Sequence, residues 1–204
     1  MENKKLVLVV EDGADERTFL RLTLESKGYS VVEADAGQVG VDLYIRHKPD
    51  LVVLDINLPD FDGVEACRKI RASHVNPATP VILLTGKSDL NTKAAGFSAG
   101  ADQYLVKPVS GNELLLWVEA LFRREGFYKQ EGEVLRCGDL VIDVASRVVQ
   151  FKGAPIDRLT AREFDLLYSL VKTRPGVISR DGILKHIWKT VADDNLVDVH
   201  LNNL

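Results

Sequence analysis

The chain has 204 residues, of which 46% are hydrophobic and 27% charged, so it is long enough to bury the core of one large domain or of two ordinary ones. No apolar run approaches the roughly 20 residues that a membrane helix requires, and the net charge of −4 gives no overall sign of a nucleic-acid partner. The N-terminal sequence MENKKLVLVVED turns acidic after five apolar residues, unlike a signal peptide, and two cysteines are too few for a disulfide framework. We therefore expect a cytoplasmic protein with no membrane partner.

Five short apolar runs rich in branched residues recur at even intervals in the first part of the chain. Segments with the spacing of amphipathic helices lie between these runs, which start at Leu6, Tyr29, Leu51, Val81 and Tyr104. Near-continuous apolar strands that alternate with helices are typical of a parallel sheet covered on both faces. The sequence therefore predicts an α/β domain over residues 1–124, with a five-stranded, doubly wound parallel sheet.

The pattern changes after the fifth of these units. Residues 125–133 are polar with two glycines and are predicted to be a linker. Residues 134–204 begin with short stretches of period 2, typical of antiparallel strands, and continue as three helical segments. The first helical segment opens with TARE, a capping box with Thr160 as N-cap and Glu163 three residues later. A small sheet followed by three helices indicates a second, α+β domain.

Polar side chains stand at the ends of the predicted parallel strands. The residues concerned, from the first, third, fourth and fifth strands, are Glu11, Asp12, Asp55, Thr85 and Lys107. Open α/β sheets bind their ligands at this carboxyl edge. Carboxylates that converge in one crevice repel one another unless a cation neutralises them, and oxygen ligands favour Mg²⁺. With a lysine and a hydroxyl opposite, the crevice would have the nucleophile, metal and hydrogen-bond donors that phosphoryl transfer requires.

These residues and the motifs around them resemble the receiver domain of bacterial two-component response regulators. The motifs VVED, LDINLPDFDG, LLTG and YLVKP agree with that family in residue type, order and strand position, over residues 1 to about 124. The resemblance implies a flavodoxin-like fold with Asp55 as the phosphoacceptor. It also implies a Mg²⁺ ion held by Glu11, Asp12, Asp55 and the backbone carbonyl of Asn57.

The same resemblance assigns roles to residues around the phosphoacceptor. Thr85 and Lys107 would bind the phosphoryl oxygens, and Tyr104 would turn inward on activation. Asn57 and Lys87 would tune how long the acyl phosphate lasts, because each lies two places beyond a site residue. The Lys107–Pro108 peptide bond would be cis, as in that family, since a cis bond is cheap only before proline.

Taken singly, each of these residues has a simpler interpretation. An acid at a strand end is most often a helix cap or a surface charge, and Tyr104 alone would be a half-buried packing residue. Their combination at the ends of four strands favours the receiver. A hydrolase of the dehalogenase type also uses an aspartate nucleophile after a strand. We set it aside because it requires a second acid two residues on, where this chain has Asn57.

The second domain is similar to the winged-helix effector of the OmpR/PhoB family. The resemblance is carried by GDLVID, LTAREFDLLYSLVKTRPGVISRDGILKHIW and NLVDVHLNNL, the last with one apolar face formed by Val197, Leu201 and Leu204. In that family the last helix enters the major groove of DNA and a β-hairpin wing touches the minor groove. The positions associated with DNA contact are Asn195, His200, Asn202 and Asn203. For His200 a packing residue near the core is an equally good interpretation, and for Asn202 and Asn203 a solvated face.

Two features argue against tight DNA binding by this sequence. The family usually continues beyond the position of Leu204 with an arginine-rich turn and the wing, so we expect an effector that is incomplete at its recognition helix and wing. Residues 156–204 also carry seven Lys or Arg and seven Asp or Glu residues, whereas DNA affinity comes largely from neutralised phosphates. The alternative to a DNA-binding regulator is therefore a phosphorylation-dependent protein-interaction module whose winged helix does not bind DNA.

Receivers of this family pair through the fourth helix, fifth strand and fifth helix, using charged pairs across a two-fold axis. Lys93 and Glu113 keep one expected pair, whereas Arg124 lacks its expected acidic partner. The usual charged residues of this face are replaced by Ala95, Ser98, Gln103 and Trp117. Trp117 is either a core residue or an exposed apolar contact. We expect a homodimer that is weaker than the family norm or differently specified.

The sequence as a whole predicts a two-component response regulator. A sensor histidine kinase would pass a phosphoryl group to Asp55 with Mg²⁺ as the cofactor, and the winged helix would control transcription through DNA. Such a protein accepts and slowly loses its own phosphoryl group, so we do not expect an enzyme that turns over an external substrate.

Overall fold

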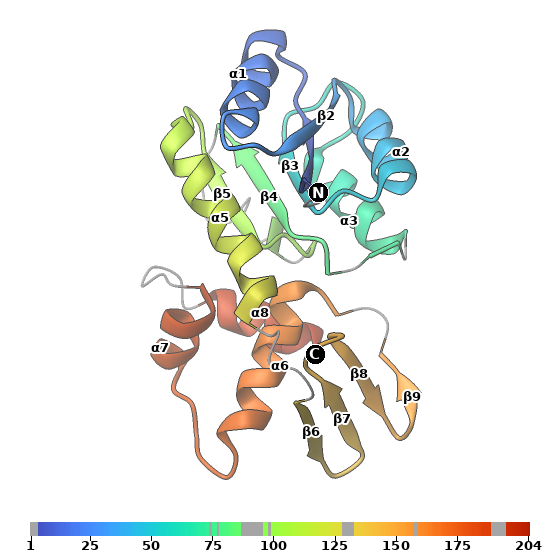
Figure 1. Ribbon diagram of the computed structural model, residues 1–204, viewed down its shortest axis with the longest axis vertical. Coiled ribbons are helices and arrows are strands. Elements are labelled where there is room, and N and C mark those ends of the chain that lie inside the picture. The colour runs from blue at the N-terminus through green and yellow to red at the C-terminus, as the bar shows by residue number, and fades with distance from the viewer. Residues whose placement is uncertain are drawn as a thin grey trace. The chain divides into compact units, whose positions relative to one another are not determined.

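The computed structural model describes residues 4–73, 75–76, 78–86, 96–97, 99–127, 133–156, 159–188 and 195–204. The chain divides into two compact units, Met1–Leu121 and Phe122–Leu204, each of which is described by itself. Figure 1 shows an α/β layer structure in the first unit, and a small sheet with helices in the second. Within the described residues no helix is both long and apolar enough to cross a membrane.

The first unit is built on a five-stranded parallel sheet of order β2-β1-β3-β4-β5. Its strands are β1 (Leu6–Val10), β2 (Ser30–Ala34), β3 (Leu51–Asp55), β4 (Val81–Thr85) and β5 (Gln103–Val106). Every residue of β3 and β4 is buried, as expected for continuous apolar runs between two helical layers. The predicted doubly wound, flavodoxin-like α/β fold is confirmed.

Helices cover both faces of this sheet. They are α1 (Ala14–Glu25), α2 (Gly37–His47), α3 (Gly63–Ala72) and α5 (Gly111–Phe127). Figure 1 shows α1 and α5 on one face and α2 with α3 on the other. In α1, Leu20 and Leu24 are buried, whereas Phe19 and Leu22 keep about half of their surface exposed (46% and 54%). Helix α5 runs to Phe127 and so extends into the segment that was predicted to be a linker.

The second unit combines a four-stranded antiparallel sheet with helices, as expected for a winged-helix effector. The strands are β6 (Val134–Cys137), β7 (Leu140–Asp143), β8 (Val148–Phe151) and β9 (Ala154–Pro155). The helical elements are α6 (Ala161–Thr173), α7 (Arg180–Ile183), the π-helical turn η1 (Leu184–Trp188) and α8 (Asn195–Asn203). The predicted capping box is present, because Thr160 Oγ1 accepts from the Glu163 amide and Glu163 Oε2 accepts from the Thr160 amide.

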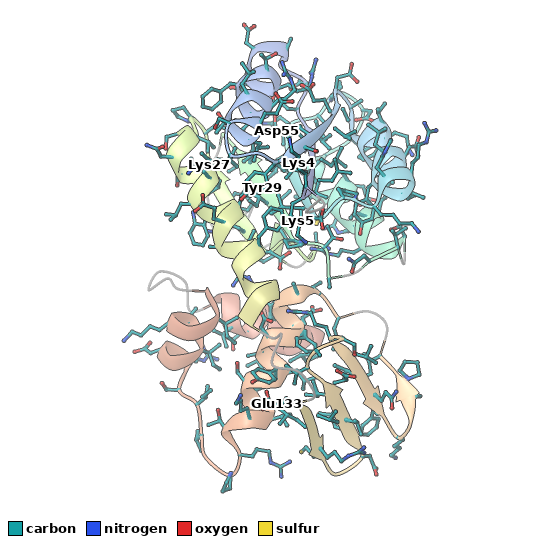
Figure 2. The ribbon with its side chains drawn as sticks, in the orientation of Figure 1. Lys4, Lys5, Lys27, Tyr29, Asp55 and Glu133 are labelled. Atoms are coloured by element: carbon teal, nitrogen blue, oxygen red, sulfur yellow. The ribbon has the colours of Figure 1, made fainter. Side chains whose placement is uncertain are left out.

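Polar contacts fix α6 against the sheet of the second unit. Arg147 donates to Asp165 Oδ1 at 3.0 Å and to the Ala161 carbonyl at 2.9 Å, and its guanidinium lies 4.3 Å from the centre of the Phe164 ring. Glu133, labelled in Figure 2, accepts a hydrogen bond from the Tyr168 hydroxyl at 3.2 Å. The entry into β6 is thereby tied to α6.

The inward face of α8 differs from the apolar face that the sequence indicated. Val197 and His200 are fully buried, whereas Leu201 and Leu204 are 40% and 45% exposed. Positions i and i+3 of a helix share one face, so α8 packs on α6 through Val197 and His200. Of the apolar face indicated by the sequence, Val197 is buried, whereas Leu201 and Leu204 stay exposed.

Candidate phosphoacceptor site

The carboxyl edge of the parallel sheet gathers the polar residues predicted from the sequence. Strands β1, β3, β4 and β5 are neighbours in the sheet, so the residues at their ends meet at one edge. Glu11 follows β1 and is 1% exposed, while Asp55 and Thr85 end β3 and β4 and are each 2% exposed. Asp55 is labelled in Figure 2 within the first unit. Parallel pairing therefore places a buried carboxylate pair beside a buried threonine.

An acidic cluster at this edge fits a divalent cation. Glu11, Asp12 and Asp55 each offer one carboxylate oxygen, and these atoms lie within 4.8 Å of one another. Asp12 is exposed, so the cluster opens to solvent on one side. A donor set made only of oxygens, with two buried carboxylates, suits a hard ion that keeps part of its water shell, such as Mg²⁺. These three residues could therefore hold the cofactor that the sequence predicted.

Lys107 neutralises the carboxylates from the far side of the cluster. Its Nζ donates to Glu11 Oε2 at 2.7 Å, to Asp55 Oδ2 at 2.9 Å and to Glu16 Oε2 at 2.6 Å. The Lys107 amide also donates to the Thr85 carbonyl at 2.6 Å, which continues the pairing of β4 with β5. The Lys107–Pro108 peptide bond is cis, as expected. One ammonium thus bridges three acidic side chains, from the loop after β1, from β3 and from α1.

Burial and charge shift the ionisation of this group. Burial, with a further contribution from the Asp55 charge, raises the pKa of Glu11 to about 7, although the hydrogen bond from Lys107 opposes the rise. Burial opposes the charged form of Lys107, but its bonds to Glu11, Glu16 and Asp55 outweigh this and raise the pKa of the ammonium. The hydrogen bond from Lys107 lowers the pKa of Glu16. The site is therefore held together by charge pairing and has a strong requirement for positive charge.

Two residues that the sequence reasoning missed, both on α1, contact the site. Arg17 donates through one guanidinium nitrogen to the carbonyls of Glu11 and Asp12, at 2.7 and 3.1 Å. Glu16, one residue earlier on α1, is the third partner of Lys107. Both lie in the first turn of α1, where an acid such as Glu16 is common for reasons of the helix dipole alone and Arg17 has no distinctive spacing. Sequence pattern gave no means of separating these roles.

The approach of α3 to the end of β3 fixes the backbone of Asp55. A Cβ built on Gly63 would lie 2.0 Å from the Asp55 carbonyl oxygen and 2.8 Å from the Ile56 Cα. The Gly63 amide donates to the Ile56 carbonyl at 2.8 Å. Asp62 caps α3, with its carboxylate accepting from the Val64 amide at 2.7 Å. The Asp-Gly pair of the LDINLPDFDG motif therefore serves close packing behind the phosphoacceptor position.

The other predicted site residues are placed as follows. The Asn57 amide donates to Asp55 Oδ1 at 3.3 Å, and the Asn57 side chain is exposed. Tyr104 is half-buried and its ring centre lies 6.2 Å from that of Phe97. Lys87 lies outside the described residues, so its predicted role remains a prediction. The structure brings Asn57 to Asp55 but does not test the tuning of the acyl phosphate.

The predicted dimer face is only partly described. Glu113 is exposed on α5. Trp117 is half-buried, so it is neither a core residue nor a fully exposed apolar contact. Leu116 beside it is 60% exposed. Lys93 lies outside the described residues, so the expected pair with Glu113 is untested.

The residues of α8 predicted to contact DNA differ in how far they are exposed. His200 is fully buried, and a side chain without exposed surface cannot reach a base edge, so its prediction as a DNA contact is corrected to a packing residue. Asn202 is exposed. The side chains of Asn195 and Asn203 lie outside the description, and their roles stay predictions.

Comparison with known proteins supports both units. Residues 7–119 match the family described as "Response regulator receiver domain", and residues 155–204 match "Transcriptional regulatory protein, C terminal". The response regulator ArlR of Staphylococcus aureus (strain Mu50) is 38% identical over 200 residues, covering 97% of this chain and 88% of that protein.

Solved structures agree with this assignment. The structure of a single-site mutant of RitR is 29% identical with a TM-score of 0.79, over 98% of this chain and 88% of that one. Response regulator DrrB of Thermotoga maritima, described as an OmpR/PhoB homolog, is 31% identical with a TM-score of 0.56, over the same shares of the two chains. The chain therefore belongs to the OmpR/PhoB family of two-component response regulators, which control transcription.

Proposed function

We propose that Asp55 is the residue that takes the phosphoryl group, and that this event is the input to the second unit. The observation that carries the proposal is the convergence of a buried aspartate, a second buried carboxylate and a lysine at the carboxyl edge of the sheet. A carboxylate oxygen is the nucleophile that such a transfer requires, and the neighbouring ammonium offers positive charge to the phosphoryl oxygens. Family membership implies a sensor histidine kinase as the donor and DNA as a target.

The proposed transfer is a single displacement at phosphorus. An Asp55 carboxylate oxygen attacks the phosphorus of a phosphohistidine, the new P–O bond forms as the P–N bond breaks, and the leaving imidazole nitrogen takes a proton. Mg²⁺ held by Glu11, Asp12, Asp55 and the Asn57 carbonyl would supply positive charge to the phosphoryl oxygens. Lys107 donates hydrogen bonds to the same oxygens, and Glu11 and Asp55 keep Lys107 oriented before transfer. Water later cleaves the acyl phosphate, so the protein turns over no external substrate.

The proposed switch runs through Thr85 and Tyr104. Thr85 ends β4 beside Asp55, and Tyr104 pairs with Leu83 of the same strand in the register of β4 and β5. A phosphoryl group that recruits the Thr85 hydroxyl would draw the end of β4 toward Asp55 and free space for Tyr104. Homodimerisation through the face that contains Glu113 and Trp117 is the proposed output of that change. Light scattering with and without a phosphoryl analogue measures it, and an unchanged mass would refute this output.

DNA recognition is proposed for the exposed face of α8. Asn202 faces solvent, and an amide side chain can pair bidentately with adenine. Asn202→Ala should weaken binding to the preferred sequence by about five- to a hundredfold, which corresponds to about 1–3 kcal/mol, and leave non-specific binding unchanged. Competition mobility-shift assays with specific and scrambled DNA measure the ratio. An equal loss on both DNAs would remove Asn202 from base recognition.

The central proposal is tested by mass spectrometry of the intact protein. Wild type incubated with acetyl phosphate and Mg²⁺ should gain one phosphoryl group, and Asp55→Asn should gain none. Asp42→Asn is the matched control, because Asp42 is an exposed acid on α2 whose only described bond is to Gln38. A chelator should abolish the gain in both competent proteins. Phosphorylation of Asp55→Asn at the wild-type level would overturn the assignment.

A further inference from the structure

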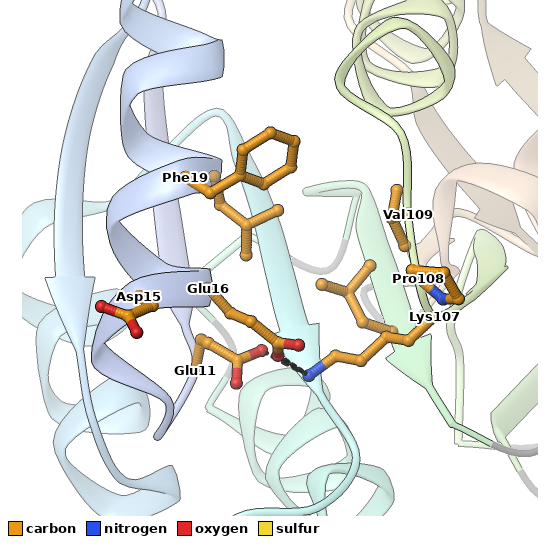
Figure 3. A pocket seen from close by; sticks show the side chains of 9 residues that line it. Glu11, Asp15, Glu16, Phe19, Lys107, Pro108 and Val109 are labelled. Carbon is orange, nitrogen blue, oxygen red and sulfur yellow. Dashed lines mark hydrogen bonds and ion pairs between the residues drawn. The ribbon is translucent and has the colours of Figure 1, made fainter.

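Glu16 occupies the one hydrogen bond of Lys107 that does not go to a buried carboxylate. An ammonium has three N–H donors, and here they are directed at Glu11, Asp55 and Glu16. The bond to Glu16 is the shortest of the three, at 2.6 Å. Figure 3 shows this contact as a bridge between α1 and the segment after β5. Lys107 therefore has no N–H left for a fourth acceptor until one of these bonds is given up.

Glu16 is the partner that can be released at the lowest cost. Its side chain is 58% exposed, whereas those of Glu11 and Asp55 are 1% and 3% exposed. It also stands outside the carboxylate cluster that could hold the cation. Exposed ion pairs contribute little to stability, because water solvates the separated charges well, whereas buried carboxylates lose far more when they lose their partner.

We propose that Glu16 is a competing counter-ion that opposes phosphorylation of this protein. It holds Lys107 in the unphosphorylated state and has to release it when Asp55 carries a phosphoryl group. The inference rests on the proposed role of Asp55. A phosphoryl group adds oxygens that require the Lys107 N–H, and its negative charge repels the Glu16 carboxylate. Glu16 therefore shifts the balance toward the unphosphorylated protein and is a positioning residue that acts through Lys107.

The surroundings of Glu16 allow the release. Glu16, Lys107, Phe19 and Val109 line a cavity of about 280 Å³ that adjoins the contact (Figure 3). The carboxylate can therefore turn away from Lys107 without displacing packed side chains. Asp15 lines the same cavity, but Figure 3 shows its carboxylate pointing away from Lys107.

This pair of neighbouring acids provides a matched experiment. Glu16→Gln and Asp15→Asn each remove one negative charge from the same turn of α1, but only the former removes an anion bonded to Lys107. The probe is fluoroberyllate, an analogue of the phosphoryl group, and its Mg²⁺-dependent binding is followed by ¹⁹F NMR at low ionic strength. We expect Glu16→Gln to bind it about two- to fivefold more tightly than wild type, the range of an exposed ion pair, and Asp15→Asn to match wild type.

Two further readouts separate the proposed role from a structural one. The gain of Glu16→Gln should shrink as salt is added, because exposed charges are screened. The midpoint of thermal unfolding without fluoroberyllate should equal that of wild type, and a marked fall would overturn the inference in favour of a structural role. Equal affinities of the Glu16→Gln and Asp15→Asn proteins for fluoroberyllate would also overturn the inference about Glu16. That result would leave the proposed role of Asp55 unaffected. Absence of binding to wild type, with Asp55→Asn as baseline, would instead refute the proposed function.

Discussion

Lys107 and Asp55 are 52 positions apart in the chain, and Lys107 Nζ donates a hydrogen bond to Asp55 Oδ2 at 2.9 Å. The bond reaches across β4, which lies between β3 and β5 in the sheet. Because Glu11 shares the same ammonium, the charge balance of the site depends on the correct assembly of β1, β3 and β5. The charged groups of the site are therefore paired only once the sheet of the first unit has formed.

Replacing Lys107 with methionine should destabilise the protein mainly when no cation is present. The change leaves Glu11 and Asp55 buried without their ammonium, and we expect the free energy of unfolding in chelator to fall by about 1–3 kcal/mol. Mg²⁺ should restore part of this loss, because it binds the folded carboxylate cluster and not the unfolded chain. Urea unfolding with and without Mg²⁺ measures both effects. Lys27→Met is the control, since Lys27 pairs with Glu119 at the surface; an equal loss with and without Mg²⁺ would contradict the prediction.

Replacing Gly63 with alanine should damage the phosphoacceptor strand. The added methyl group would collide with the Asp55 carbonyl at 2.0 Å, so either α3 or the end of β3 must move. We expect a loss of about 1–3 kcal/mol in the free energy of unfolding, and slower phosphorylation because Asp55 is displaced. Gly86→Ala is the matched control, because a Cβ at Gly86 meets no atom of the described residues within 4 Å. Unaltered stability and phosphorylation of Gly63→Ala would show that the close approach is not required.

Replacing Thr160 with alanine should destabilise the second unit alone. Thr160 Oγ1 accepts from the Glu163 amide at the start of α6, and loss of an N-cap costs about 1 kcal/mol. The chain has two tryptophans, so a Trp117→Phe background leaves Trp188 as a fluorescent probe in the second unit. Urea unfolding followed at Trp188 should shift for Thr160→Ala and much less for Thr160→Ser, which keeps the hydroxyl. A shift of the same size for both variants would mean that the methyl group, not the cap, matters.

The two cysteines should react at different rates with a thiol reagent. Cys67 is fully buried on α3, and burial raises the pKa of its thiol to about 11, so its thiolate is scarce at pH 8. Cys137 on β6 is partly exposed. We expect one thiol per chain to react in the folded protein at pH 8 and the second only after unfolding. Cys137→Ser should then leave no rapidly reacting thiol; rapid labelling of that variant would contradict the burial of Cys67.

The order of elements and the chemical character of the site follow from the sequence. Apolar runs set the strands, and parallel strands have to bring their carboxyl ends to one edge, so Glu11, Asp55 and Lys107 could be placed together without coordinates. The capping box at Thr160 was predictable for a similar reason, because its two hydrogen bonds are local to four residues. Patterns that act within one element, or at a fixed end of one, can be read from sequence.

The direction in which individual side chains face depends on how the elements pack, and it could not be predicted from the sequence. Helical periodicity defines a stripe but not which side of it meets a neighbour, so it did not show that α8 buries His200 and exposes Leu201. The same limit applies to α1. An acid that is there only because the helix dipole stabilises it occupies the same sequence position as an acid that binds Lys107. The roles of Glu16 and Gly63 arise from contacts between different elements, of α1 with the segment after β5 and of α3 with β3. Such contacts depend on distances of a few ångströms, and the packing of α1 and α3 on the sheet sets those distances.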